Sequence, residues 1–400
     1  MKILVIGPIK FEIIEGKIFL SNSGISYCIW GWAHGLEKAG NEVALLPSVS
    51  VGNLQLSTIF QKVTLIPGPI KNYKSPIHLS NKWIDIIIKE FGVPDLIHIH
   101  DIYVHFNIAL ARKFNKLDWP YIITPSGSFS PIAQNRKKLK KKIARFFFIN
   151  HYIKNAKAIH LLSNNEEKHC NNLFPNINKI IIPNGIDSSI NDTPNKLTKV
   201  YVGGTESKDF IFGYLGRMNI KIKGIDLMLK AIKKIQDEFD NINLKFVFVG
   251  PMGDPLYYIK NSKEEIAELH TLLKEMKYPE RIIFSDPVFG TNKWHVLRSF
   301  DIFFQPSRTE GMPIAVLEAM LMGKPCLVTE GSSMGETINI SQGGWVCQTS
   351  VNGIYESIKN ILNTPKKIIK EKGINAKNYV IKKHDWGTVA EQLISTIQKL

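Results

Sequence analysis

Residues 301–329 read DIFFQPSRTEGMPIAVLEAMLMGKPCLVT and predict a strand, a turn and a helix in succession. The apolar run 302–305 is typical of a buried strand. Pro313 suits the first turn of a helix, where no amide hydrogen bond is lost, and Gly323 followed by Pro325 ends that helix. We therefore expect a strand, a loop and a helix here, as in a parallel α/β sheet.

The predicted helix, residues 314–322, contains a single polar residue, Glu318. A helix that is apolar on every side is normally buried, and a buried carboxylate needs a cation or hydrogen-bond donors around it. Glu310 lies in the turn before the helix. Both carboxylates can therefore reach a ligand at the helix N-terminus, where free amides and the helix dipole favour a phosphate. The alternative is that Glu310 caps the helix and Glu318 bonds to a neighbouring loop.

Short apolar runs alternate with helix-like stretches along the whole chain, which predicts parallel sheets in two doubly wound α/β domains. The runs of the first half are residues 3–6, 42–46, 64–67, 96–100, 121–124, 158–163 and 180–183. Those of the second half are residues 210–215, 244–250, 281–285, 302–305, 325–329 and 345–347. Residues 187–195 between them are rich in Ser, Asn, Asp, Thr and Pro, as a linker is. The predicted domains are Rossmann-like and span residues 1–187 and 188–380, followed by a C-terminal helix within residues 381–400.

The composition is that of a globular protein with a strong positive charge. Its 400 residues suit two domains, and 44% hydrophobic residues exclude general disorder. Lys and Arg number 51 against 35 Asp and Glu, a formal net charge of +16. Such a field attracts nucleic acid, a lipid surface or phosphorylated ligands, and composition does not choose among these.

The cysteines indicate a reducing compartment. None of Cys28, Cys170, Cys326 and Cys347 belongs to a CxxC pair or has a histidine at metal-ligand spacing. We expect reduced core residues in a cytoplasmic protein, and no metal ion. No run of about twenty apolar residues occurs, so no segment is expected to cross a membrane.

Residues 306–325 contain a Pro-Ser turn, Glu310-Gly311, a second glutamate eight positions after the first, Ala-Met, and Gly-x-Pro. This pattern resembles the signature of the retaining GT-B glycosyltransferases of family 4. The resemblance implies that Glu310 contacts the donor sugar and that Glu318 holds the ribose hydroxyls. The backbone amides that it places at the diphosphate are those around Gly311, Met312 and Ile314.

Two cations precede this signature in the sequence. Arg217 follows the predicted strand 210–215, and Lys223 immediately precedes Gly224 and a helix. Arginine can bind two diphosphate oxygens at once, and lysine adds a point charge. The alternative is that both residues are exposed loop charges without a role in binding. They resemble the family's Gly-Arg and Lys-Gly motifs, which implies that both stabilise the leaving diphosphate. The resemblance also places the nucleobase at the loop that contains Val288.

Three strand ends of the first half carry further candidates. Gly24 lies in a Ser/Asn-rich loop after the first strand, where the family has a glycine-rich donor loop. His98, His100 and Asp101 end the strand 96–100, with both histidines on one face. His100 and Asp101 are expected at the acceptor side, and a metal site here is the less favoured reading. Ser126 stands where many relatives have a histidine near the donor sugar, and we also assign it to the acceptor side.

Residues 136–147 combine a dense run of cations with an apolar stripe. The basic residues are Arg136, Lys137, Lys138, Lys140, Lys141, Lys142 and Arg145, and the apolar ones are Leu139, Ile143, Phe146 and Phe147. Such a helix can lie on an anionic bilayer, with Lys137, Lys140 and Lys141 facing the membrane. The alternative is that the stripe packs on its own domain while the lysines are solvated. Nucleic acid is less favoured, because no binding motif accompanies the charge.

The sequence therefore predicts a retaining hexosyltransferase-type enzyme that uses a nucleoside-diphosphate sugar as co-substrate and needs no cofactor. The acceptor is expected to be a saccharide or a lipid-linked precursor of a cell-surface polysaccharide, such as lipopolysaccharide or capsule. We expect the protein in the cytoplasm, with peripheral contact to the inner face of the membrane, and the resemblance implies that the last helix crosses back to the first domain. Two alternatives stay open: a GT-B sugar-nucleotide epimerase, and a non-catalytic basic protein that binds a membrane or nucleic acid.

Overall fold

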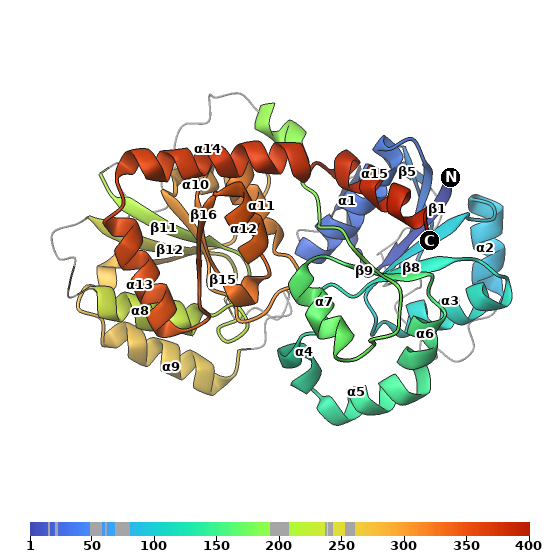
Figure 1. Cartoon of the computed structure of the whole chain (residues 1–400), viewed down its shortest axis with the longest axis horizontal. Coiled ribbons are helices and arrows are strands. Elements are labelled where there is room, and N and C mark those ends of the chain that lie inside the picture. Colours follow the sequence, from blue (N-terminus) through green and yellow to red (C-terminus); the bar gives the residue numbers. More distant parts are fainter. Residues whose placement is uncertain are drawn as a thin grey trace. The chain divides into compact units, whose positions relative to one another are not determined.

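The computed structural model describes residues 1–14, 17–20, 23–48, 58–60, 62–68, 81–192, 208–236, 238, 243–252 and 261–400. The chain forms two compact units (Figure 1). Unit 1 comprises Met1–Asp187 together with His384–Leu400, and unit 2 comprises Ser188–Lys383. Ser188–Asp192 form a short 3₁₀-helix at the start of unit 2. The rest of the predicted linker, residues 193–195, lies outside the described residues.

Unit 1 contains, in its described part, an eight-stranded sheet in the order β10-β9-β8-β7-β1-β4-β6-β5. Neighbouring strands are parallel except for β5 and β6. The strands are β1 Lys2–Gly7, β4 Glu42–Pro47, β5 Thr58–Phe60, β6 Val63–Leu65, β7 Leu96–His100, β8 Tyr121–Thr124, β9 Ala158–Leu161 and β10 Lys179–Ile181. The helices are α1 Gly24–Lys38, α2 Lys82–Glu90, α3 His105–Lys116, α4 Pro131–Asn135, α5 Lys138–Ala144, α6 Asn150–Lys154, α7 Asn164–Asn171 and α15 Trp386–Ile397. A π-helix, Arg145–Ile149, joins α5 to α6.

The long loop expected after the first strand is in part a β-hairpin. Phe11–Ile14 form β2 and Lys17–Leu20 form β3, and the two strands pair antiparallel. The segments FEII and KIFL are short apolar runs around Glu15-Gly16, a pattern that favours a hairpin. The prediction of a loop was therefore wrong for these residues, and β5 was also missed.

Unit 2 contains, among the residues described, a six-stranded parallel sheet in the order β13-β12-β11-β14-β15-β16. The strands are β11 Phe210–Leu215, β12 Leu244–Val249, β13 Ile282–Ser285, β14 Ile302–Gln305, β15 Cys326–Thr329 and β16 Gly344–Cys347. The helices are α8 Ile225–Ile235, α9 Lys263–Lys274, α10 Thr291–Ser299, α11 Ile314–Leu321, α12 Gly335–Ser341, α13 Val351–Leu362 and α14 Lys366–Lys383. None of the described helices of the chain is long and apolar enough to cross a membrane.

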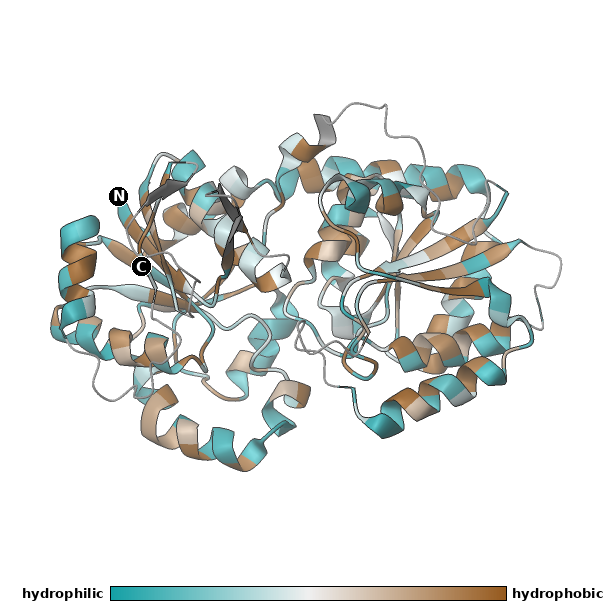
Figure 2. Cartoon of the chain, turned by 180° about the vertical axis from the view of Figure 1, so that it is seen from behind, coloured by the Kyte–Doolittle hydropathy of each residue, from teal (hydrophilic) through white to brown (hydrophobic). Residues whose placement is uncertain are grey.

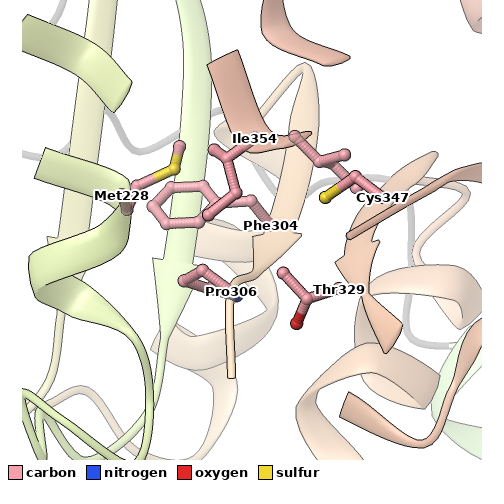
Figure 3. A pocket seen from close by; sticks show the side chains of 7 residues that line it. Met228, Phe304, Pro306, Thr329, Cys347 and Ile354 are labelled. Atoms are coloured by element: carbon pink, nitrogen blue, oxygen red, sulfur yellow. The ribbon is translucent and has the colours of Figure 1, made fainter. Parts of the chain in front are cut away.

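The apolar strands form the centre of each unit. Figure 2 shows the strands of both sheets mostly in hydrophobic colours, while the helices around them carry hydrophilic faces. Helices cover both faces of a parallel sheet, so its strands are apolar on both sides, and Ile3, Leu4, Val5 and Ile6 are all fully buried. In unit 2, Met228, Phe304 and Thr329 lie around a small gap that has no room for a water molecule (Figure 3). It is a packing gap in the core.

The C-terminal helix α15 belongs to unit 1 because Trp386 fills a space bounded by three glycines. A Cβ atom at Gly31 or Gly35 of α1 would lie 2.1 Å or 2.5 Å from atoms of Trp386, and one at Gly185 would lie 2.7 Å from its ring. Ile186 pairs with Asp385 in a parallel bridge. Trp386 is 2% exposed, so a side chain at Gly31 or Gly185 would displace its ring, and one at Gly35 would displace its backbone.

Candidate functional site

Helix α11 holds Glu318 in an apolar environment and gives it a cation. Glu318 is 4% exposed. The Lys293 ammonium, from α10, donates to Glu318 Oε1 at 2.6 Å. The requirement for a donor was predicted, and the alternative that Glu318 bonds to a neighbouring loop is wrong, because Lys293 lies on a helix. The only sequence signal for Lys293 was its position five residues after Val288, which lies in the loop assigned to the donor.

Glu310 lies in the loop between β14 and α11 and is partly buried. Its carboxylate pairs with the ammonium of Lys223. It also accepts a hydrogen bond from the Ser307 hydroxyl at 2.9 Å and a longer one from the side-chain amide of Gln305 at 3.4 Å. The residue that caps α11 is Pro313, without a side-chain bond, so the alternative that Glu310 only caps the helix is wrong. Glu310 is held by loop and strand residues, and its side chain does not cap the N-terminus of α11.

The loop after β11 approaches the Glu310 loop so closely that a glycine is required. Gly224 has a φ of +68°, and a Cβ atom there would lie 1.9 Å from the carbonyl oxygen of Pro306. Lys223 is thereby placed beside Glu310. Arg217, in the same loop, is exposed, and its carbonyl accepts a hydrogen bond from the Tyr214 hydroxyl at 2.8 Å. Unit 2 therefore brings the predicted residues Lys223 and Glu310 into direct contact.

A second ion pair locks the same two loops together. The guanidinium of Arg308 donates to both carboxylate oxygens of Asp226, at 2.6 Å and 2.9 Å, and to the Lys221 carbonyl at 2.7 Å. The Arg308 amide donates to the Ile222 carbonyl at 2.9 Å. We call this arrangement the Arg308–Asp226 clamp. No sequence pattern signalled it, because its two residues are 82 positions apart.

Asp226 is 2% exposed and stays ionised because of its partners. Burial by itself raises the pKa of this carboxyl group, but hydrogen bonds from Arg308 and Lys221 outweigh burial and hold the pKa below its ordinary value. Lys221 donates to Asp226 at 2.9 Å and to Glu268 at 2.8 Å. Lys221 and Lys223 are two positions apart, but one supports the clamp and the other faces Glu310.

Unit 1 contains a buried chain of hydrogen bonds through two histidines. His98 Nε2 and His160 Nδ1 lie 2.7 Å and 2.8 Å from the Thr124 hydroxyl, and His160 Nε2 donates to the Ile182 carbonyl at 2.8 Å. The rings of His98 and His100 are 4.2 Å apart, as expected for one face of a strand. Burial lowers the pKa of His160 to about 4 and that of His100 to about 3, so both are neutral at pH 7. Sequence reasoning missed His160.

Two protein-family models match the chain, one for each half of the sequence. Residues 198–395 match the model described as glycosyl transferases group 1, and residues 22–190 match the model for glycosyltransferase family 4. The chain is a glycosyltransferase of family 4. The predictions that the chain belongs to glycosyltransferase family 4 and is a glycosyltransferase are confirmed.

The relatives of this glycosyltransferase support the same assignment. An uncharacterized glycosyltransferase of Methanocaldococcus jannaschii is 26% identical over 303 residues, which cover 75% of this chain and 74% of that protein. Protein CapJ of Staphylococcus aureus is 26% identical over 281 residues, 68% of this chain and 64% of that protein. Among solved structures, Anabaena HepE in complex with UDP-glucose matches with a TM-score of 0.73 and 15% identity, covering 100% of both chains. The predicted GT-B fold is thus confirmed.

The other predicted donor residues of the glycosyltransferase lie at the start of α11 and in the loop before α10 in unit 2, and at the start of α1 in unit 1. Gly311 and Met312 precede α11, and Ile314 is its first residue. Val288 lies between β13 and α10. Gly24 is the exposed first residue of α1, and a Cβ atom there would meet nothing within 4 Å. Their contacts with a donor stay predictions.

The predicted acceptor residues Asp101 and Ser126 both have a left-handed backbone, with φ of +74° and +49°. The Ser126 loop is fixed by Glu166, a buried carboxylate that sequence reasoning missed. Glu166 accepts hydrogen bonds from the Gly127 amide at 2.5 Å and the Leu162 amide at 2.8 Å. Within the described residues, no group of three or more His, Cys, Asp or Glu side chains is placed to hold a metal ion.

The apolar stripe of the basic segment faces outward. Residues 136–149, which we call the basic segment, contain α5 and the π-helix. The exposed fractions are 71% for Leu139, 50% for Ile143, 74% for Phe146 and 61% for Phe147. The alternative that this stripe packs on its own domain is therefore wrong. Among the residues that the structure describes, none of its basic side chains forms an ion pair.

Proposed function

We propose that this glycosyltransferase moves a sugar from a nucleoside-diphosphate sugar to a saccharide or lipid-linked acceptor, with retention of the anomeric configuration, in the synthesis of a cell-surface polysaccharide. The observation that carries the proposal is the pairing of Lys223 with Glu310 at the loop before α11, with Glu318 on the same helix. The complex of HepE with UDP-glucose supports a nucleotide-sugar donor.

Each charged residue has a distinct role in this proposal. Lys223 and Arg217 stabilise the negative charge that develops on the leaving diphosphate, an electrostatic effect that often dominates a rate enhancement. Glu310, held by Lys223 and Ser307, orients the donor sugar. Glu318 accepts hydrogen bonds from the ribose hydroxyls while Lys293 balances its charge. The proposal requires no metal ion or other cofactor.

The transfer step proceeds on one face of the sugar. The bond from the anomeric carbon to the diphosphate oxygen breaks, and the acceptor oxygen bonds to the same face of that carbon. The acceptor's proton passes to an oxygen of the leaving phosphate, so no protein base is needed. The role of the protein is to hold both substrates in reacting geometry and to stabilise the diphosphate.

A thermal-shift screen against UDP-, GDP- and CMP-linked sugars tests the donor site, because a ligand that binds only the folded protein raises its melting temperature. We expect a shift with one donor that is lost in Arg217→Ala. The control is Lys233→Ala, which removes an equal charge from an exposed pair with Glu275. No shift with any donor, for a folded protein, contradicts the proposal. An epimerase is excluded if free nucleoside diphosphate forms only when an acceptor is present.

We further propose that the basic segment contacts the inner face of the cell membrane. Cations beside exposed apolar side chains are the combination by which peripheral helices bind anionic lipid, and each basic residue near the surface contributes roughly 1 kcal/mol. Leu139 and Phe146 are the most exposed large apolar side chains of the described residues. A lipid-linked acceptor would then reach the enzyme from the membrane.

A further inference from the structure

A groove runs beside the basic segment, between it and helix α3. Its volume is about 220 Å³. The buried side chains of Ile108 and Ile149 and the half-buried Ala144 line it, as does Phe148, which is 39% exposed. A dry cavity of about 150 Å³ accommodates a benzene ring, so this groove has room for a longer hydrocarbon segment.

The lining of the groove includes one cation. Lys140 lines the groove and is exposed. No Asp or Glu occurs from Trp119 to Asn165, whereas residues 136–145 contain seven Lys and Arg. A ligand of this site therefore gains from a hydrocarbon part and from a negatively charged part next to it.

The π-helix carries further exposed apolar side chains beside the groove. It is a wider turn, common at functional sites, and here it contains the three consecutive phenylalanines 146–148. All three are exposed, and the ring of Phe148 faces the Arg112 guanidinium at 5.2 Å. Exposed apolar side chains that adjoin one another indicate a binding surface. In Figure 2 the helices of this region carry hydrophobic and hydrophilic residues side by side.

We propose that the groove binds the hydrocarbon chain of a phosphate-bearing lipid, with the phosphate at Lys140. The inference rests on the proposed function in one respect: such a lipid is the class of acceptor that the enzyme would glycosylate. A single-stranded nucleic acid fits less well, because its bases carry polar edges, whereas the buried side chains that line the groove, Ile108 and Ile149, are aliphatic. The aromatic lining residues Tyr103 and Phe148 are half-buried and exposed, respectively. The membrane contact is a property of the outer surface, and the groove is a separate site for one chain.

Titration of the full chain with butyl, hexyl and octyl phosphate, below their micelle concentrations, tests the proposal. Each buried methylene strengthens binding by up to about fourfold, so affinity should rise steeply with chain length. Inorganic phosphate and octyl glucoside should each bind far more weakly, because one lacks the chain and the other the charge. Equal affinity for butyl and octyl phosphate, or tighter binding of an oligonucleotide that octyl phosphate does not displace, overturns the proposal.

Variants separate the groove from the outer surface. Ala144→Phe fills the groove and should weaken octyl phosphate binding at least tenfold, while sedimentation with anionic vesicles stays as in the wild type. Leu139→Ala is the matched control: it should weaken vesicle sedimentation and leave octyl phosphate binding unchanged. If Ala144→Phe does not fold, Phe148→Ala, which removes a wall of the groove, should also lower the affinity. Wild-type affinity in a folded Ala144→Phe or Phe148→Ala variant rejects the site.

These experiments need no donor and no transfer. Octyl phosphate binding that depends on Ala144 would therefore stand even if the thermal-shift screen finds no nucleotide sugar. Conversely, a donor shift that is lost in Arg217→Ala supports the donor site whether or not the groove binds a chain. Failure of one proposal is thus distinguishable from failure of the other.

Discussion

Two lysine-rich regions of this glycosyltransferase have similar compositions and opposite surroundings. In unit 2, Lys221, Lys223 and Lys230 all pair with carboxylates. In the basic segment of unit 1, no ion pair forms within the part of the chain that the structure describes, and apolar side chains lie exposed between the cations. The fold supplies carboxylate partners to the first group. In the second group Lys141 donates to the Ala133 carbonyl and lies over the Tyr103 ring, and the described part of the chain places no carboxylate within ion-pair distance of the basic segment. The formal net charge of +16 therefore does not show which lysines bind a ligand until the partners of each lysine are known.

Replacing Lys223 should have the largest effect. In Lys223→Met the diphosphate loses a cation and Glu310 loses its ion-pair partner, so we expect kcat to fall by about 10²–10³-fold, as for loss of one donor to a developing charge. Steady-state release of the nucleoside diphosphate measures this change.

The control for that variant is Lys230→Met, which breaks a partly exposed pair with Glu268. Its kcat should stay within about twofold of the wild type, since surface ion pairs contribute roughly 0–1 kcal/mol to stability and Lys230 lies outside the proposed site. Equal loss in both variants would mean that the site does not distinguish Lys223 from any other paired lysine of unit 2.

Reversing two charges of the basic segment should have the next largest effect. Lys140→Glu with Lys141→Glu removes two cations near an anionic surface and adds two anions, which should weaken vesicle binding by at least about 2 kcal/mol or roughly 30-fold. Sedimentation with vesicles of increasing phosphatidylserine content measures this, and donor affinity should not change. If mutant and wild type sediment alike, the basic segment does not contact lipid.

The Arg308–Asp226 clamp should make unit 2 sensitive to acid. The folded-state pKa of Asp226 lies below its ordinary value of 3.8. The stabilisation is therefore fully present above that value and is lost as pH falls through the lower, folded-state pKa. Asp226→Asn cannot titrate. We expect it to be less stable than the wild type at pH 7, by about 1–2 kcal/mol, and to lose less stability on acidification.

Urea unfolding between pH 7 and pH 3, followed by hydrogen exchange of peptides from unit 2, measures both effects. The control is Asp95→Asn, an aspartate of unit 1 that accepts a hydrogen bond from the Lys2 amide at an exposed site. Parallel acid curves for wild type and Asp226→Asn would show that the clamp contributes nothing to the pH dependence.

The smallest effect is expected for Lys293→Met. This variant leaves Glu318 buried without its cation, which should cost about 1 kcal/mol of stability. Adding Glu318→Gln removes the unpaired charge and should restore part of the loss. Thermal unfolding without ligand measures both variants, and a double variant less stable than Lys293→Met would argue against charge pairing as the role of Lys293.

The strands and the need for partners were readable from the sequence, but the partners were not. The thirteen apolar runs all became strands, because buried parallel strands have a local signature. Glu318 had to meet a donor for reasons local to its helix. That the donor is Lys293, and that Arg308 meets Asp226, depends on how distant loops approach one another. The same holds for His160, which reaches Thr124 only through the pairing of β8 with β9.

The place of α15 has a consequence for how the protein is made. Unit 1 consists of two separate stretches of chain, and Trp386 occupies a space that Gly31, Gly35 and Gly185 leave open. The ribosome synthesises Trp386 only after the whole of unit 2. The core of unit 1 therefore stays incomplete at the position of Trp386 while unit 2 is synthesised and begins to fold. A chain truncated before Trp386 would contain a complete second unit and an incomplete first one.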